Sequence, residues 1–125
     1  MADELHLRLQ GGPEAAAVAR RQLSPLGSVL DPELLETLHL LVTELVSNAV
    51  RHAAAETISV AVAVDPRRVL TEVTNAGIGF QHDRRRRPRD DHTGFGLLLV
   101  ERLARDWGVD GGPNATRVWF ELTRT

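Results

Sequence analysis

Two short segments of alternating hydrophobicity, joined by a four-residue turn, constrain the fold of this chain more than any other feature. Residues 57–65 alternate apolar with small or polar side chains, and one face carries Ile58, Val60, Val62 and Val64. Asp65-Pro66-Arg67-Arg68 has the composition of a turn, and a second strand is predicted at 69–74. Strands this close in sequence pair as an antiparallel hairpin. The chain is therefore expected to build a sheet that contains antiparallel pairing.

An amphipathic helix is predicted directly before this hairpin, over 32–54. Asp31 is a suitable N-cap, and Pro32 suits the first helical position because its missing N–H would have no helical partner there. Apolar residues then recur at spacings of three and four, at Leu34, Leu38, Leu41, Leu45 and Ala49. Such a stripe predicts a helix that packs one face against the core.

The remaining segments complete an α+β arrangement. The pattern predicts an edge strand at 5–10, helices at 13–23 and 95–106, a last strand at 117–123, and loops or turns at 24–27 and 111–114. Residues 76–93 fit neither periodicity and are expected to form a long loop of the kind that usually carries function. This order predicts a two-layer α/β sandwich, with a mixed, mostly antiparallel sheet and helices on one face.

Composition limits the classes of function. A chain of 125 residues that is 42% hydrophobic suits one domain over 1–125. The absence of cysteine excludes disulfides, thiolate catalysis and cysteine-ligated metals. A net charge of −2 gives no general reason to expect direct nucleic-acid binding. The acidic start and the short apolar runs predict neither a secretion signal nor a membrane span, so a cytoplasmic location is expected.

Glu44 and Asn48 stand out within the long predicted helix. They are four residues apart, which places them on one face one turn from each other. Val46, Ala49 and Val50 surround Asn48 with apolar neighbours, so its amide is expected to be shielded from water and to need a partner. In one interpretation the partner of Asn48 is a bound ligand. In the other, a loop carbonyl is the partner of Asn48 and Glu44 simply faces solvent. The two residues alone leave both interpretations open.

Glycines mark both ends of the long loop. Asn75-Ala76-Gly77-Ile78-Gly79 follows a strand, where glycine lets the backbone approach a ligand or turn. Thr93-Gly94-Phe95-Gly96-Leu97 begins a helix, whose free N–H groups form an anion site suited to phosphate. Each motif alone is also compatible with an ordinary turn. The second lacks the third glycine of a dinucleotide fingerprint and the lysine of a P-loop.

In order and spacing, 44–53, 75–79 and 94–100 resemble the N box and the two glycine boxes of the GHKL ATPase superfamily. That superfamily includes gyrase-type topoisomerases, heat-shock ATPases and sensor histidine kinases. The short chain and its ending, 107–109 and 118–122, are similar to the bacterial anti-sigma factor serine/threonine kinases. The resemblance extends over about 5–122 and implies the Bergerat ATP-binding fold.

The resemblance also implies roles for these residues. ATP and Mg²⁺ would be bound, with Asn48 as the metal ligand, Glu44 as the general base and 78–93 as a lid over the nucleotide. The remaining nucleotide-binding residues would be Asn75, Gly77, Gly79, Thr93, Gly94, Phe95, Gly96 and Leu97. The partners would be an anti-sigma factor antagonist, which receives the γ-phosphate on a serine, and a sigma factor. A homodimer is a further expectation from the resemblance.

One residue departs from the family pattern. The first glycine box normally begins with an aspartate that accepts a hydrogen bond from the adenine amino group, and this chain has Asn75 there. An amide oxygen still accepts that bond but without charge assistance, so affinity is expected to fall about ten- to thirtyfold. The change favours an alternative function, a partner-binding module of the same fold without catalysis. An ATPase without a protein substrate is a third alternative.

Other side chains keep two interpretations each. The run Arg84–Arg87 would be a solvated part of the lid, or it would contact phosphate or a partner. It has no interleaved aromatic residues and is flanked by aspartates, which disfavours nucleic-acid binding by this run. His52 would cap the helix end or act as a ligand, and Arg51 would pair with Glu44 or a phosphate. Trp119 would be exposed for a partner or covered by the first strand, and Trp107 is expected in the core at a helix end.

Overall fold

The structure of the chain is a computed structural model, and it describes residues 3–53, 56–76, 97–111 and 115–124. Its elements are β1 (Asp3–Gln10), α1 (Ala15–Leu23), the 3-10 helix η1 (Ser24–Ser28), α2 (Pro32–Ala53), β2 (Thr57–Val64), β3 (Arg68–Ala76), α5 (Leu97–Leu103), β4 (Asp106–Gly111) and β5 (Ala115–Thr123). The predicted hairpin, long helix, first strand and last strand are confirmed. The segment expected as a loop at 24–27 forms η1 instead.

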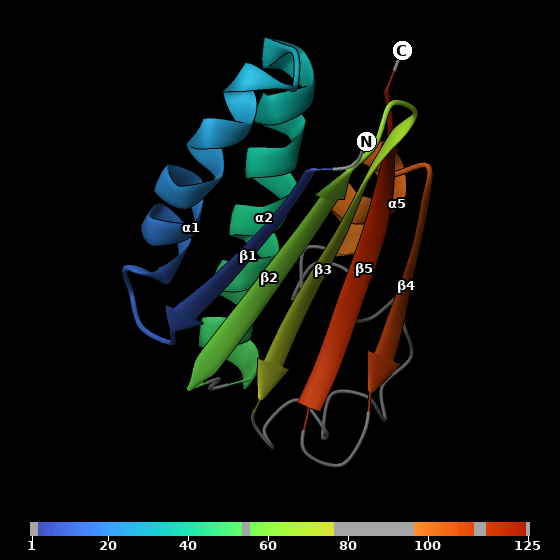
Figure 1. The fold of residues 1–125 in the computed structure, drawn as a ribbon. Coiled ribbons are helices and arrows are strands. Elements are labelled where there is room, and N and C mark those ends of the chain that lie inside the picture. Colours follow the sequence, from blue (N-terminus) through green and yellow to red (C-terminus); the bar gives the residue numbers. More distant parts are fainter. Residues whose placement is uncertain (1–2, 54–55, 77–96, 112–114, 125) are drawn as a thin grey trace.

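The strands form one five-stranded sheet in the order β1-β2-β3-β5-β4. Each neighbouring pair of these strands runs antiparallel, so the prediction of a mixed sheet is corrected to a fully antiparallel one for the described strands. Figure 1 shows α1, α2 and α5 on the same face of the sheet. The two-layer α+β architecture is therefore confirmed. Within the described ranges, no helix has both the length and the apolar character needed to cross a bilayer.

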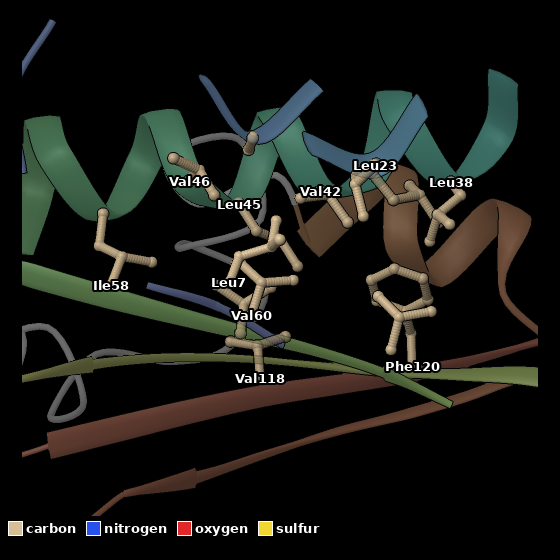
Figure 2. Close-up of a cluster of buried hydrophobic side chains, with 14 of the residues drawn as sticks. Leu7, Leu23, Leu38, Val42, Leu45, Val46, Ile58, Val60, Val118 and Phe120 are labelled. Atoms are coloured by element: carbon tan, nitrogen blue, oxygen red, sulfur yellow. The ribbon is translucent and has the colours of Figure 1, made fainter. Parts of the chain in front are cut away.

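The core lies between the helices and the sheet. The four residues predicted to share one face of β2, from Ile58 to Val64, are at most 1% exposed. Figure 2 shows Leu45 of α2 and Val60 and Val118 of the sheet pointing into the space between the layers. Burial of one such side chain stabilises the fold by about 1.5–3 kcal/mol relative to exposure. The alternating pattern read from the sequence thus sets which face of the sheet receives the helices.

The long helix α2 begins as its sequence predicts. Asp31 Oδ1 accepts a hydrogen bond of 2.8 Å from the backbone N–H of Leu34, which is an N-cap interaction, and Pro32 is the first helical residue. Of the predicted stripe, Leu34 is half-buried, and the other members, Leu38, Leu41, Leu45 and Ala49, are buried. This packing holds α2 across the sheet and fixes which of its faces is left for polar residues.

The helix predicted at 95–106 is wrong at its C-terminal end. α5 ends at Leu103, and a strand that the sequence did not predict, β4, follows at Asp106. Its sequence, Asp-Trp-Gly-Val-Asp-Gly, is rich in residues that disfavour strands, so pairing with β5 and not intrinsic propensity makes it a strand. Within α5, Leu97 and Val100 are buried, whereas Leu98 and Leu103 are exposed.

The new strand also settles the positions of both tryptophans. Trp119 lies opposite Gly108 in the β4–β5 register, and a Cβ on Gly108 would stand 2.6 Å from the indole Nε1. The indole therefore lies against the Gly108 backbone. The first strand, β1, is at the other edge of the sheet and does not cover Trp119. Trp107 is partly buried against the core as expected, but it is on β4 and not at a helix end.

Arg124 joins three segments at the end of the molecule where the β2–β3 turn lies. Its guanidinium donates hydrogen bonds of 2.7 Å to the carbonyl of Asp65 in the turn and of 2.7 Å to the carbonyl of Val29, just after η1. Its backbone N–H donates to the Arg67 carbonyl at 2.8 Å. Arg124 thus connects the β2–β3 turn of the sheet to the segment that follows η1 in the helical layer.

Candidate functional site

Glu44 and Asn48 occupy one face of α2, as their spacing predicts. Asn48 is 1% exposed, and Glu44 is half-buried. The leucine stripe turns the neighbouring faces of α2 toward the core, so this polar face lies at the border between core and solvent. Among the described residues, Glu44 has no ion-pair or hydrogen-bond partner for its carboxylate. A carboxylate so placed is free to accept a proton from a bound group.

Asn75 belongs to the inward face of β3, near the end of that strand. It is 6% exposed and lies in register between Ile58 on β2 and Thr116 on β5. Thr116 is also buried, at 2% exposed. The inward residues of the other rows of β3 and β5 are apolar except for Thr71, and in the Asn75–Thr116 row both paired residues are polar. Figure 1 shows the end of β3 and the C-terminal half of α2 at the same end of the molecule, and the two elements are in contact.

Two polar atoms of this region are buried without a hydrogen-bond partner. They are Nδ2 of Asn48 and Oδ1 of Asn75, and the described residues have two more elsewhere, His39 Nε2 and Thr71 Oγ1. An unsatisfied buried polar atom costs about 1–3 kcal/mol, so such atoms are uncommon in native proteins unless a ligand or water completes them. Asn75 offers an acceptor that matches the N–H donor of an exocyclic amino group such as that of adenine.

Arg51 is the partner of the other Asn48 atom. Its Nη2 donates a hydrogen bond to Asn48 Oδ1, three residues earlier on the same helix. The sequence left Arg51 open between Glu44 and a phosphate; within the described residues it pairs with Asn48 and not with Glu44. A contact of Arg51 with phosphate stays a prediction. The side-chain oxygen of Asn48 is thus held by a cation, while its NH₂ group is unpaired.

Comparisons with known proteins show the family to which this chain belongs. A family model described as "Histidine kinase-like ATPase domain" matches residues 9–122. The chain belongs to this family. ATP binding is a general property that such a domain implies.

Two solved structures resemble this histidine kinase-like ATPase domain. One contains the RsbU and RsbW domains of Rv1364c from Mycobacterium tuberculosis, with 21% identity and a TM-score of 0.73, over 98% of this chain and 33% of that chain. The other is the Acinetobacter baumannii histidine kinase AdeS, with 13% identity and a TM-score of 0.54, over 95% of this chain and 67% of that chain. This chain therefore spans a third of the length of the first structure. At these identities the likeness shows the shared fold.

Several residues predicted for the nucleotide site of the domain lie outside the part of the chain that the structure describes. They are Gly77, Gly79, Thr93, Gly94, Phe95 and Gly96, together with the expected lid at 78–93, the run Arg84–Arg87 and the side chain of His52. Leu97 is described: it is the first residue of α5, and its side chain is buried in the core at 6% exposed. A contact of Leu97 with phosphate would therefore involve its backbone and not its side chain.

Thr116 is a candidate site residue that the sequence analysis missed. The last strand was predicted to begin at Arg117, so Thr116 was left outside the alternating pattern, although β5 begins at Ala115. Extending the alternation of Val118, Phe120 and Leu122 back by one step would have placed Thr116 on the inward face. Its register opposite Asn75 could not be found in the same way, because β3–β5 pairing joins residues far apart in sequence.

The residues of the domain fit a magnesium ion that arrives with a nucleotide. Asn48 has a carbonyl oxygen, the hard ligand that Mg²⁺ prefers, and Mg²⁺ is usually bound by one or two protein groups together with phosphates and water. Within the described ranges, no cluster of three or more His, Asp or Glu side chains could hold a metal by itself. Mg²⁺, when bound, would neutralise phosphate charge.

Proposed function

We propose that this chain binds Mg-ATP and acts as a serine/threonine kinase of the anti-sigma factor type. The observation that carries the proposal is the buried Asn48 one turn from Glu44, at the same end of the core as Asn75. Among the residues that the structure describes, the Glu44 carboxylate and the Asn75 side-chain oxygen have no partner. In this proposal, Asn48 serves as the metal ligand, Glu44 as the general base and Asn75 as the acceptor for the adenine amino group, all around one region. The RsbW domain named for one similar structure supports a role in partner switching.

In this proposal each described residue has one task. Asn48 Oδ1 would hold the metal that accompanies the phosphates, and Asn75 and Thr116 would receive the adenine. Glu44 would accept the proton of a serine hydroxyl on an antagonist protein as that oxygen attacks the γ-phosphorus. The bond between the γ-phosphorus and its bridging oxygen would break, and ADP would leave. Gly77, Gly79, Thr93, Gly94, Phe95, Gly96 and Leu97 remain proposed contacts to the nucleotide.

The proposed partners are an antagonist protein, which is the phosphate acceptor, and a sigma factor, which competes with it for the kinase. We further propose that the protein is a homodimer and is cytoplasmic. The net charge of −2 and the absence of aromatics within Arg84–Arg87 support a protein partner over direct nucleic-acid contact.

Asn75 favours a second candidate function. Because its amide lacks the negative charge of the family's aspartate, nucleotide affinity is expected to be about ten- to thirtyfold weaker. If binding is too weak for turnover, the domain would act as a partner-binding module that has kept the fold. The Asn75→Asp variant distinguishes the two functions, since it should restore tight ATP binding in a kinase whose remaining residues are intact.

Transfer of labelled γ-phosphate from ATP to a purified antagonist protein tests the proposal. Glu44→Gln should abolish transfer while ATP affinity stays close to that of the wild type, because the amide cannot accept the proton. A matched control is Glu33→Gln, which removes an exposed carboxylate from the first turn of the same helix. Transfer by Glu44→Gln at the wild-type rate would remove Glu44 from the mechanism.

A further inference from the structure

Arg51 lies beside the atom that the proposed function assigns to the metal. Asn48 is 1% exposed, whereas Arg51 is exposed, so the arginine reaches from the surface of α2 to a buried amide oxygen. The two residues are three apart on one helix, which allows the contact without any change in the backbone. Nothing beyond α2 itself is needed to form it.

The hydrogen bond fixes which way round the Asn48 amide lies. A guanidinium has only donors, so it can pair with Oδ1 and not with the NH₂ group. In this orientation, Nδ2 of Asn48 is buried and has no hydrogen-bond partner among the described residues. The oxygen that would bind a metal is therefore already directed at a resident cation.

We propose that Arg51 competes with the divalent cation for Asn48 Oδ1 and so weakens the dependence of nucleotide binding on Mg²⁺. This inference rests on the proposed function, because it assumes a nucleotide with its metal at this site. A second lone pair on Oδ1 does not remove the competition, since a divalent cation and a guanidinium on one oxygen repel each other. Binding of the metal thus requires Arg51 to leave.

The competition is expected to be modest. Partial exposure to water reduces the charge-assisted bond to about the strength of an ordinary hydrogen bond, so its loss corresponds to about three- to tenfold in an equilibrium constant. Once displaced, the long side chain of Arg51 remains at the surface beside the site, where it can approach a phosphate. Replacing Arg51 therefore has two opposing consequences: losing a phosphate contact weakens nucleotide binding, and losing the competition for Asn48 Oδ1 strengthens metal binding.

A comparison of binding with and without metal separates the two routes. The ratio of ADP affinity with Mg²⁺ to ADP affinity in a chelator is the coupling between metal and nucleotide. Loss of a direct phosphate contact lowers both affinities, whereas loss of the competition raises the ratio. Calorimetric titration with ADP avoids turnover, so the readout is independent of kinase activity.

The variants are Arg51→Met, which keeps a long side chain without the charge, and Arg21→Met as the matched control. Arg21 is an exposed arginine on α1, so its replacement changes the net charge by the same amount. We expect the Mg²⁺-induced gain in ADP affinity to be about three- to tenfold larger in Arg51→Met than in the wild type. Arg21→Met should match the wild type. An equal gain in all three proteins overturns the inference and leaves the proposed function intact.

A second readout needs no nucleotide. In ¹H–¹⁵N spectra of the free protein, the side-chain NH₂ resonances of Asn48 should shift in Arg51→Met and stay in place in Arg21→Met. Unchanged resonances in Arg51→Met mean that the contact does not restrain Asn48, which overturns the inference whatever the nucleotide data. If none of the proteins binds ADP, the proposed function fails and the competition fails with it.

Discussion

The two ends of the layer between helices and sheet are built differently. At the end with the β2–β3 turn, the buried rows of the sheet are apolar apart from Thr71, whose Oγ1 is buried without a partner. Arg124 donates hydrogen bonds to the carbonyls of Asp65 and Val29 at this end. At the opposite end, Asn48 and Asn75 each keep a buried polar atom without a partner. Among the described residues, unpartnered buried atoms thus occur at both ends, and the second end differs because its atoms belong to Asn48 and Asn75, near Glu44. We therefore expect the first end to contribute mainly to stability and the second to ligand binding. Substitutions should therefore affect the two properties separately.

The largest expected effect is at the apolar end. Phe120 is 0% exposed and packs in the core, as Figure 2 shows. Phe120→Ala should lower the free energy of unfolding by about 3–5 kcal/mol, because it removes a large buried ring and leaves a cavity. Urea unfolding followed by circular dichroism measures this change. The control, Leu103→Ala at a 45% exposed position, should cost far less; an equal loss would contradict the assignment of the core.

Arg124 should have the next largest effect. Arg124→Met keeps the stem but removes the hydrogen bonds to the carbonyls of Asp65 and Val29, which should cost about 1–3 kcal/mol. ATP affinity measured on the folded variant should be unchanged, because the residue stands at the end away from the proposed site. Arg105→Met, which removes an exposed arginine, is the comparison variant. If Arg124→Met left the unfolding free energy unchanged but weakened ATP binding, the assignment of stability to this end and of ligand binding to the opposite end would be contradicted.

Asn75 should respond in the opposite direction. Asn75→Val replaces a buried polar group that lacks a partner by an apolar one, so the unfolding free energy should rise by about 1 kcal/mol. ATP affinity should fall at least about tenfold, because the acceptor for the base is lost. Chemical unfolding and calorimetry on the same preparation test both halves. Lower stability together with unchanged ATP affinity would show that Asn75 is structural.

His39 should give the smallest effect, a dependence of stability on pH. Burial lowers the pKa of its imidazole, and the positive charge of Arg20 lowers it further, against the opposing effect of Glu36. The folded protein therefore binds this proton less readily than the unfolded chain. Stability should be complete above the unfolded pKa of about 6.5 and should fall as the pH drops below it.

Unfolding free energies measured between about pH 5 and 7 test the effect of His39. His39→Gln should reduce the slope of stability against pH. His6→Gln, at an exposed histidine on β1, should retain it. A slope that is the same in His39→Gln and the wild type would exclude His39 as its source.

The sequence predicted those parts of the molecule whose signals are local. The alternation at 57–64, the Asp31 cap of α2 and the shared face of Glu44 and Asn48 all depend on residues close in sequence. β4 was missed because its strand state comes from pairing with β5 and not from its own residues. The position of Trp119 was left open for the same reason, since it depends on the order of strands across the sheet.

The features of the candidate site also divide into those that local sequence patterns predict and those that depend on three-dimensional contacts. The buried state of Asn48 followed from its apolar neighbours on the helix. The pairing of Asn75 with Thr116 depends on the register of β3 and β5, which no local pattern gives. Arg51 pairs with Asn48, three residues earlier on α2, and not with Glu44, seven residues earlier, and this choice depends on side-chain geometry that the sequence pattern did not give.

Calorimetric titration of the protein with ATP in the presence of Mg²⁺ tests the central claim most directly. The wild type should bind ATP, and Asn48→Ala should lose at least about tenfold in affinity. Gln22→Ala, which removes an exposed amide from α1, should bind as the wild type does. Circular dichroism of each variant establishes that it is folded. Equal ATP affinity in Asn48→Ala and the wild type, or no binding by the wild type, would contradict the account.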